Sequence, residues 1–153
     1  MIEVLITILI MSVGLLGAAA MQAEALKGGN DSILRSKAVA SVADISDRIR
    51  ANIGGLASYA WALGALSDPP VANPPNCVAN QCTAPQMATY DLSQWLLGLR
   101  NPASGLPGAQ AAIVQPGAGV SPGLLTITVQ WTDRLQRGEG TALPEQYTTQ
   151  VQF

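Results

Sequence analysis

The stretch VLITILIMSVGLLGAAAMQA, from Val4 to Ala23, holds twenty residues without one ionisable side chain. As an α-helix rising ~1.5 Å per residue it would be roughly 30 Å long, which matches the hydrocarbon core of a bilayer. A secretory signal peptide would carry a basic segment before a shorter apolar core. Here no Lys or Arg precedes the run, and the helical pattern continues through Leu26. The sequence therefore predicts a retained membrane helix rather than a removed signal.

Small residues recur about one turn apart within this apolar run, at Ser12, Gly14, Gly17 and Ala18. Such residues let two helices approach closely in lipid, although glycine and alanine are also simply common in membrane helices. Gly14 and Gly17 each cost on the order of 1 kcal/mol of helix propensity relative to alanine. We therefore mark them as candidate positions for helix packing or for local loosening.

The composition excludes several classes of function. The chain has 153 residues, of which 48% are hydrophobic and 12% charged, with a formal net charge of −2 and no histidine. One compact domain plus an apolar segment fits this length, and nothing favours binding to nucleic acid. Without histidine, Ser-His-Asp, Cys-His and histidine-ligated metal sites are impossible. The carboxylate pairs Asp44/Asp47 and Asp133/Glu139 fall on expected solvated faces or loops, so we predict no enzyme, no catalytic residue, no metal and no cofactor.

A second helical segment is expected from Ser32 to Leu66, after a weak point at Gly28-Gly29. One apolar stripe runs along it at alternating gaps of three and four, which is the period of an α-helix. Its members are Val42, Ile45, Ile49, Ile53, Leu56, Ala60 and Leu63. Gly54-Gly55 softens the run, and Pro69-Pro70 stops it. The two segments together predict one long helix whose second half packs against a partner face.

The two cysteines, Cys77 and Cys82, stand in the stretch NCVANQC within a loop rich in Pro and Asn. A disulfide closing this small loop would add roughly 2 kcal/mol of stability and would need an oxidising compartment. Two unpaired thiols are the alternative. A zinc site is disfavoured because two cysteines alone do not fill a tetrahedral shell.

The remainder predicts a small β-rich domain. A short helix with Asp91 as its N-cap is expected over 91–97, and strands are expected over 111–115, 125–131 and 146–153. In the last two strands, apolar or aromatic residues alternate with Thr and Gln, which indicates one buried face on each of two antiparallel neighbours. Trp61, Trp95 and Trp131 are expected in the core, and Arg134 and Arg137 in a solvated loop.

The N-terminal motif resembles the start of type IV pilins, most closely the minor pilins of the PilV kind. It runs from Ile2-Glu3-Val4-Leu5-Ile6 through Ser12-Val13-Gly14-Leu15-Leu16-Gly17 to Ala19-Ala20-Met21-Gln22. Later pieces agree in order with that subfamily: Trp95, Leu106-Pro107-Gly108, and Trp131-Thr132-Asp133 before a polar closing strand. The N-terminal motif is highly specific for pilins, whereas the downstream pieces decide only the subfamily.

The resemblance implies an α+β pilin fold in which a long N-terminal helix packs on a small antiparallel sheet. Residues 1–27 would form the transmembrane and filament-core helix. Residues 28–66 would form its amphipathic second half, and residues 67–153 a periplasmic β-rich domain with the cysteine loop. The first half of the helix would span the inner membrane before assembly.

The sequence departs from the family at its start. Pilin precursors have a short basic leader ending in Gly, cut before an aromatic residue that becomes N-methylated. Here Met1 stands where the family usually has Leu, so the leader and the first mature residues are expected to be missing. Lys27, Arg35 and Lys37 follow the span and would by themselves favour the opposite membrane orientation. We follow the resemblance, because the leader's basic residues are absent from that count.

Glu3 is the principal candidate site residue. An ionisable group at the edge of an apolar helix is costly unless it is paired. In pilins the corresponding glutamate is thought to pair with the N-terminal amine of a neighbouring subunit as the helix leaves the bilayer for the filament. The alternative is that Glu3 lies at the headgroup level and anchors one end of the helix.

The implied function is that of a non-enzymatic minor pilin. It would prime pilus assembly with other minor and major pilins, enter the filament at its tip, support a tip adhesin there, and so serve adhesion and twitching motility. Two alternatives stay open. The first is a minor pseudopilin of type II secretion or of a DNA-uptake pilus. The second is a membrane-anchored periplasmic binding module that never polymerises.

Overall fold

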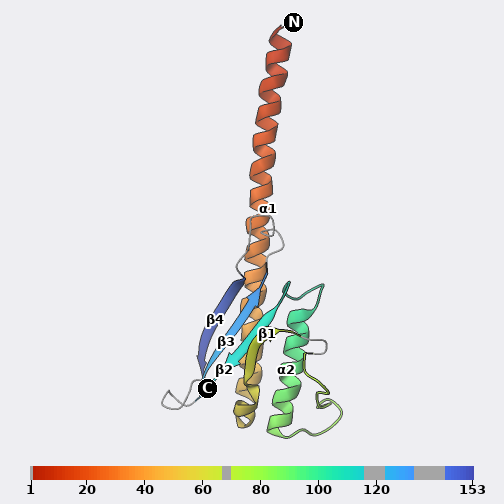
Figure 1. Cartoon of the computed structure of the whole chain (residues 1–153), viewed down its shortest axis with the longest axis vertical. Coiled ribbons are helices and arrows are strands. Elements are labelled where there is room, and N and C mark those ends of the chain that lie inside the picture. The colour runs from red at the N-terminus through yellow and green to blue at the C-terminus, as the bar shows by residue number, and fades with distance from the viewer. Residues whose placement is uncertain (1, 67–69, 116–122, 133–143) are drawn as a thin grey trace. The chain divides into compact units, whose positions relative to one another are not determined.

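The computed structural model describes residues 2–66, 70–115, 123–132 and 144–153. Two helices, one 3-10 helix and four strands are found in these ranges, which confirms the predicted α+β class (Figure 1). In chain order they are α1 (Ile2–Ala51), η1 (Ile53–Tyr59), β1 (Trp61–Ala65), α2 (Ala84–Arg100), β2 (Gln110–Val114), β3 (Leu124–Trp131) and β4 (Glu145–Gln152).

The chain divides into two compact units, Met1–Leu34 and Arg35–Phe153, and the division falls inside α1. In the first unit, α1 runs unbroken through Gly28 and Gly29, so the weak point predicted there does not interrupt the helix. The second unit holds the end of α1 and every other element. The three-way division of the chain at residues 27 and 66 stays a prediction, except that the helix does not reach Leu66.

The helix predicted to end at Leu66 in fact ends at Ala51, and the prediction is wrong beyond that residue. The local cause is the approach of another segment. An ideal Cβ on Gly55 would lie 2.5 Å from the carbonyl oxygen of Ala84, so only glycine fits there. The Asn52 side-chain amide donates to that same carbonyl at 2.8 Å. Further along, the chain forms strand β1, which pairs with β2. The helical period of the sequence does not indicate this strand.

The sheet is a four-stranded antiparallel meander in the order β1-β2-β3-β4. In β3 every second residue is buried, as the alternating pattern predicted, and the buried positions are Leu125, Ile127, Val129 and Trp131. β3 pairs with β4 along its whole length, with Thr128 opposite Thr148. The two predicted C-terminal strands are therefore confirmed, together with their antiparallel pairing.

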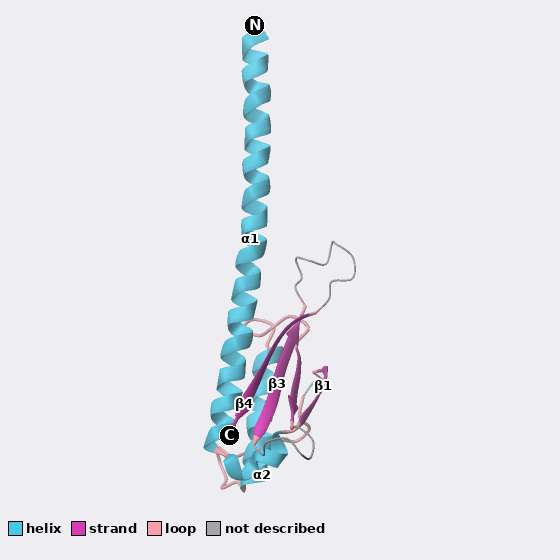
Figure 2. Cartoon of the chain, turned by 90° about the vertical axis from the view of Figure 1, so that its left-hand side faces the viewer, coloured by secondary structure: helices cyan, strands magenta, loops and turns pink. Residues whose placement is uncertain are grey.

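The hydrophobic core of the second unit lies between the sheet and the helices. Figure 2 shows the end of α1 that belongs to this unit lying along one face of the sheet. Its buried apolar side chains are Ala38, Val42, Ile45 and Ile49, which repeat at the predicted helical spacing. The predicted stripe ends there, because Ile53 is 57% exposed and Leu63 is 49% exposed.

Helix α2 begins seven residues before the predicted N-cap Asp91, at Ala84. Its N-cap is Thr83, whose backbone N–H donates to the side-chain oxygen of Gln86 at 2.9 Å. Pro85 falls in the first turn, where a missing N–H costs no helical hydrogen bond. The prediction of Asp91 as an N-cap is therefore wrong, and Asp91 lies in the helix interior, 7% exposed.

Candidate functional site

The first candidate surface is the apolar part of α1 in the first unit. Its large apolar side chains are exposed by between 52% at Ile6 and 77% at Met21. Soluble monomers rarely expose a contiguous apolar surface of this extent, which marks a contact with lipid or protein. The exposed side chains are Ile2, Val4, Leu5, Ile6, Ile8, Leu9, Ile10, Met11, Val13, Leu15, Leu16, Met21 and Leu26.

The polar side chains of this segment fall into two kinds. The hydroxyl of Thr7 donates to the carbonyl of Val4, and that of Ser12 to the carbonyl of Leu9, each at 2.8 Å. Both hydroxyls are therefore satisfied within the helix and add little cost to burial in an apolar medium. The carboxylate of Glu3 lies exposed in the first turn, without a hydrogen-bond or ion-pair partner among the described residues. Glu3 is thus the ionisable group of residues 2–23 that needs an outside partner.

Gly14 and Gly17 are open on their outer side. Apart from their chain neighbours and the adjacent turns of α1 itself, no heavy atom of the described residues lies within 4 Å of an ideal Cβ at either position. The space is available to another helix, and the packing role of the two glycines stays a prediction. By length and composition, α1 is the single helix among the described residues that could cross a membrane.

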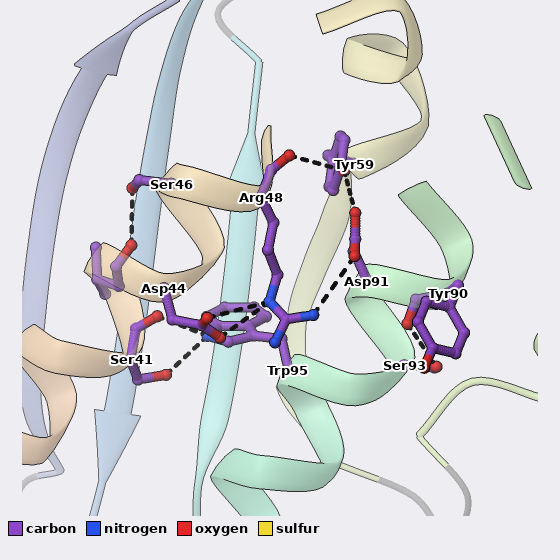
Figure 3. Close-up of polar contacts among 10 residues, drawn as sticks. Ser41, Asp44, Ser46, Arg48, Tyr59, Tyr90, Asp91, Ser93 and Trp95 are labelled. Carbon is purple, nitrogen blue, oxygen red and sulfur yellow. Dashed lines mark hydrogen bonds and ion pairs between the residues drawn. The ribbon is translucent and has the colours of Figure 1, made fainter. Parts of the chain in front are cut away.

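In the second unit, Asp91 joins three elements in a polar network formed with Arg48, Asn52 and Tyr59. Figure 3 shows the contacts of Asp91 with Arg48 and Tyr59. The Tyr59 hydroxyl donates to one carboxylate oxygen of Asp91 at 2.6 Å. The guanidinium of Arg48 donates to the other at 3.4 Å. The Asn52 side-chain N–H donates a hydrogen bond to the Ala84 carbonyl at 2.8 Å and another to the Tyr59 hydroxyl oxygen at 3.3 Å. This Asp91 network ties the end of α1 and the 3-10 helix to α2.

Two members of the Asp91 network, Tyr59 and Arg48, have a pKa above its usual value. Burial raises the pKa of Tyr59, and the hydrogen bond to Asp91 raises it further, because both disfavour the phenolate. Partial burial lowers the pKa of Arg48, but hydrogen bonds and charges from Asp44 and Asp91 outweigh it, so this pKa lies above its usual value. Tyr59 therefore stays a neutral donor and Arg48 a cation, which is what the buried carboxylate requires.

Sequence reasoning missed the Asp91 network, although a signal was present. Asp91 interrupts an apolar stripe on α2 that includes Ala88, Leu92, Trp95 and Leu99, all of which are buried. A lone carboxylate on the buried face of a helix requires partners. That requirement could have pointed to a cation and a hydroxyl on neighbouring elements.

A cavity of about 300 Å³ lies between α1, α2 and the loop after α2. Lys37, Asp44, Arg48 and Trp95 are among its lining residues. The Trp95 indole N–H donates to the Ser41 hydroxyl oxygen at 2.7 Å. Asp44 is held by Arg48 at 3.1 Å, so the cavity presents an ion pair rather than a free carboxylate.

The other predicted residues are placed as follows. Asp47 pairs with Arg50 at 2.8 Å on the helix surface. Trp95 and Trp131 are buried in the core as predicted, whereas Trp61 is half-buried. The described residues contain no group of three or more His, Cys, Asp or Glu side chains suited to a metal ion. Predictions on 133–143, namely Asp133, Glu139, Arg134 and Arg137, lie outside the described residues.

Cys77 and Cys82 form a disulfide, as expected from the sequence. It closes a short loop that leads directly into Thr83, the N-cap of α2. Within the loop, the Asn76 side chain accepts a hydrogen bond from the Ala79 backbone N–H at 3.2 Å. The disulfide therefore fixes the chain just before the helix that carries Asp91.

Comparison with known proteins gives one match. The family model described as Tt1218-like, type IV pilin Tt1218, matches residues 20–93, slightly less than half of the chain. This segment includes both cysteines and all four residues of the Asp91 network. No curated protein and no solved structure matches the chain. A long N-terminal helix followed by a small antiparallel sheet is consistent with the pilin fold. The match over 20–93 therefore supports the assignment of this chain as a type IV pilin.

Proposed function

We propose that the chain is a minor type IV pilin of the PilV kind. It is held in the inner membrane by the apolar part of α1, with its second unit in the periplasm. It then primes pilus growth with other minor and major pilins and enters the filament at its tip, where it supports an adhesin. The observation that carries this proposal is the exposed apolar run of α1, in which Glu3 is the one ionisable group of residues 2–23.

The chemistry of Glu3 explains why such a segment would enter a filament. Lipid tails are as apolar as the side chains of this helix, so the hydrophobic effect does not drive its transfer from lipid to a bundle of similar helices. A carboxylate taken into an apolar bundle without a partner is strongly penalised. Pairing with the terminal amine of a neighbouring subunit removes that penalty for both charges. Assembly would thus select a register in which the two groups meet.

The second unit supports the proposal through the contacts that link its elements. The Asp91 network and the Cys77–Cys82 disulfide fix the elements that follow α1. A disulfide of this kind suits the oxidising periplasm and the exterior of the cell. A subunit that packs repeatedly beside others benefits from a surface of fixed shape.

The test compares two carboxylates on the same helix. Glu3→Ala removes the group near the start of α1, and Glu24→Ala removes an exposed carboxylate beyond the apolar run. Both variants are expressed in the source cell in place of the natural chain, and sheared pili are separated from membranes. We expect Glu3→Ala to stay in the membrane fraction and Glu24→Ala to appear in the sheared pili. Equal incorporation of both variants would contradict the proposed role of Glu3.

The same cells separate the alternatives. Labelled antibody against this chain should mark filament ends if it is a tip-located minor pilin. Loss of secreted enzymes without loss of pili would instead indicate a secretion pseudopilin. A chain that never leaves the membrane fraction, with unchanged pili on its deletion, would indicate an anchored binding module.

A further inference from the structure

Strand β4 forms one edge of the sheet, and most of its length lacks the usual protection against pairing. Edge strands are commonly shortened, bulged, or given lysine or proline. β1, at the opposite edge, follows that rule, with five residues and an irregular register between Trp61 and Gly64. β4 has eight residues and pairs with β3 without a register shift; Pro144 and Glu145 stand at its start, and residues 146–152 hold no charge or proline. The two edges are therefore built differently (Figure 1).

The register shows which backbone groups point away from β3. The Phe153 N–H donates to the Gly123 carbonyl, and this pair continues the β3–β4 register by one position. Hydrogen-bonded and non-hydrogen-bonded pairs alternate along antiparallel strands. The N–H and C=O groups of Gln146, Thr148 and Gln150 therefore point to the outer edge. None of these backbone groups has a hydrogen-bond partner among the described residues.

The inner face of β4 is also incompletely covered. On β3, the inward-facing Leu125, Ile127 and Val129 are 0% exposed. On β4, the residues facing the same side, Tyr147 and Val151, are only half-buried. A further strand beside β4 could bring apolar side chains against both of them.

We propose that the outer edge of β4 is a strand-addition site for an extended, uncharged segment of a partner protein. The partner strand would bond the free N–H and C=O groups of Gln146, Thr148 and Gln150. Its alternate residues would be apolar toward Tyr147 and Val151, and small and polar on the opposite face. From Gln146 to Gln152 the edge offers no charge to a charged segment, so affinity there comes from backbone hydrogen bonds and apolar contact. This proposal goes beyond pilin assembly through α1 and rests only on the second unit.

Amide hydrogen exchange at single residues tests the proposal directly. The probe is a capped peptide of alternating threonine and valine, matched in length to β4. It is added to the isotopically labelled full chain in detergent. Without peptide, the amides of Tyr147, Thr149 and Val151 should be protected, and those of Gln146, Thr148 and Gln150 should exchange rapidly. With saturating peptide, exchange of the latter three should slow by about tenfold or more, because a paired amide exchanges only through opening.

Matched variants locate the effect at the edge. Thr148→Pro removes an outward N–H without removing a bond to β3, and Thr148→Lys keeps the amide but adds a charge at the edge. Thr128→Lys adds the same charge on the same face, one strand inward, and breaks the same contact between the two hydroxyls at 3.1 Å. Peptide binding should be lost in Thr148→Pro, weakened in Thr148→Lys, and retained in Thr128→Lys.

Three results would overturn the proposal. The first is slow exchange of the outward amides in the dilute chain without peptide, since the edge would then already be covered. The second is protection that rises with protein concentration alone, which would assign the edge to a second copy of this chain. The third is a peptide that leaves these amides unchanged. None of the three bears on the Glu3 test, so failure of one proposal is distinguishable from failure of the other.

Discussion

Replacing Asp91 by Asn should destabilise the second unit measurably, because it removes the one carboxylate of the Asp91 network. The Tyr59 hydroxyl now donates to a charged carboxylate oxygen at 2.6 Å and would then donate to a neutral amide oxygen. The NH2 group of the new side chain would face the Arg48 guanidinium, which is itself a donor. A buried hydrogen bond to a charged group contributes about 1.5–3 kcal/mol, and roughly half would be lost with a neutral acceptor. The Arg48 pair, with one side chain 34% exposed, adds at most about 1 kcal/mol. We expect a total loss of about 2 kcal/mol.

Thermal unfolding of the full chain in detergent measures this loss. The fluorescence of the buried Trp95 and Trp131 reports on the second unit. For a unit of this size, about 2 kcal/mol corresponds to a midpoint roughly 8 °C lower. Asp47→Asn is the matched control, because it removes a carboxylate from a surface pair whose side chain is 75% exposed. It should change stability by less than about 0.5 kcal/mol. Equal midpoints for Asp91→Asn and the natural chain would refute the reasoning.

Three other perturbations follow from the same structure. The pKa of Tyr59 is raised, so its contribution is complete below the unfolded value near 10 and is lost as pH rises through the folded pKa. The free energy of unfolding should thus fall above pH ~10 in the natural chain and fall less in Tyr59→Phe, as followed by urea titration. Replacing Cys77 and Cys82 by Ser should cost about 2 kcal/mol, and reductant should then have no further effect on the melting temperature. Gly98→Ala meets open space inside α2 and should stabilise by up to about 1 kcal/mol, whereas Gly105→Ala places a Cβ against the Leu99 carbonyl and should lower the melting temperature.

The elements with strong single periodicities could be predicted from the sequence. β3 alternates strictly between apolar and polar residues, and its burial follows that alternation from Leu125 to Trp131. The apolar run of α1 could be predicted to be helical from its length and its lack of charged residues alone. In these segments the local pattern and the tertiary environment agree, so the polarity of each residue is enough to predict whether it is buried or exposed.

The sequence alone could not reveal features that depend on distant contacts. The chain just after α1 is shaped by the approach of Ala84 to Gly55, 29 residues away along the chain, whereas the helical period continued past this point. The role of Asp91 depends on Arg48 and Tyr59 from other elements. The local sequence by itself predicts Asp91 to be the N-cap of a helix, because Asp commonly takes that position. Strand β1 could be found only through its pairing with β2.

The central claim is that the apolar part of α1 lies against other pilin helices after assembly. A photo-reactive residue at Leu9, which is 64% exposed, tests this in sheared filaments. The same residue at Val78, 82% exposed in the disulfide loop, serves as a control outside the helix. We predict that Leu9 forms cross-links to the N-terminal helix of another pilin in the filaments. Cross-links from Leu9 to lipid alone, or filaments that lack this chain, would contradict the claim.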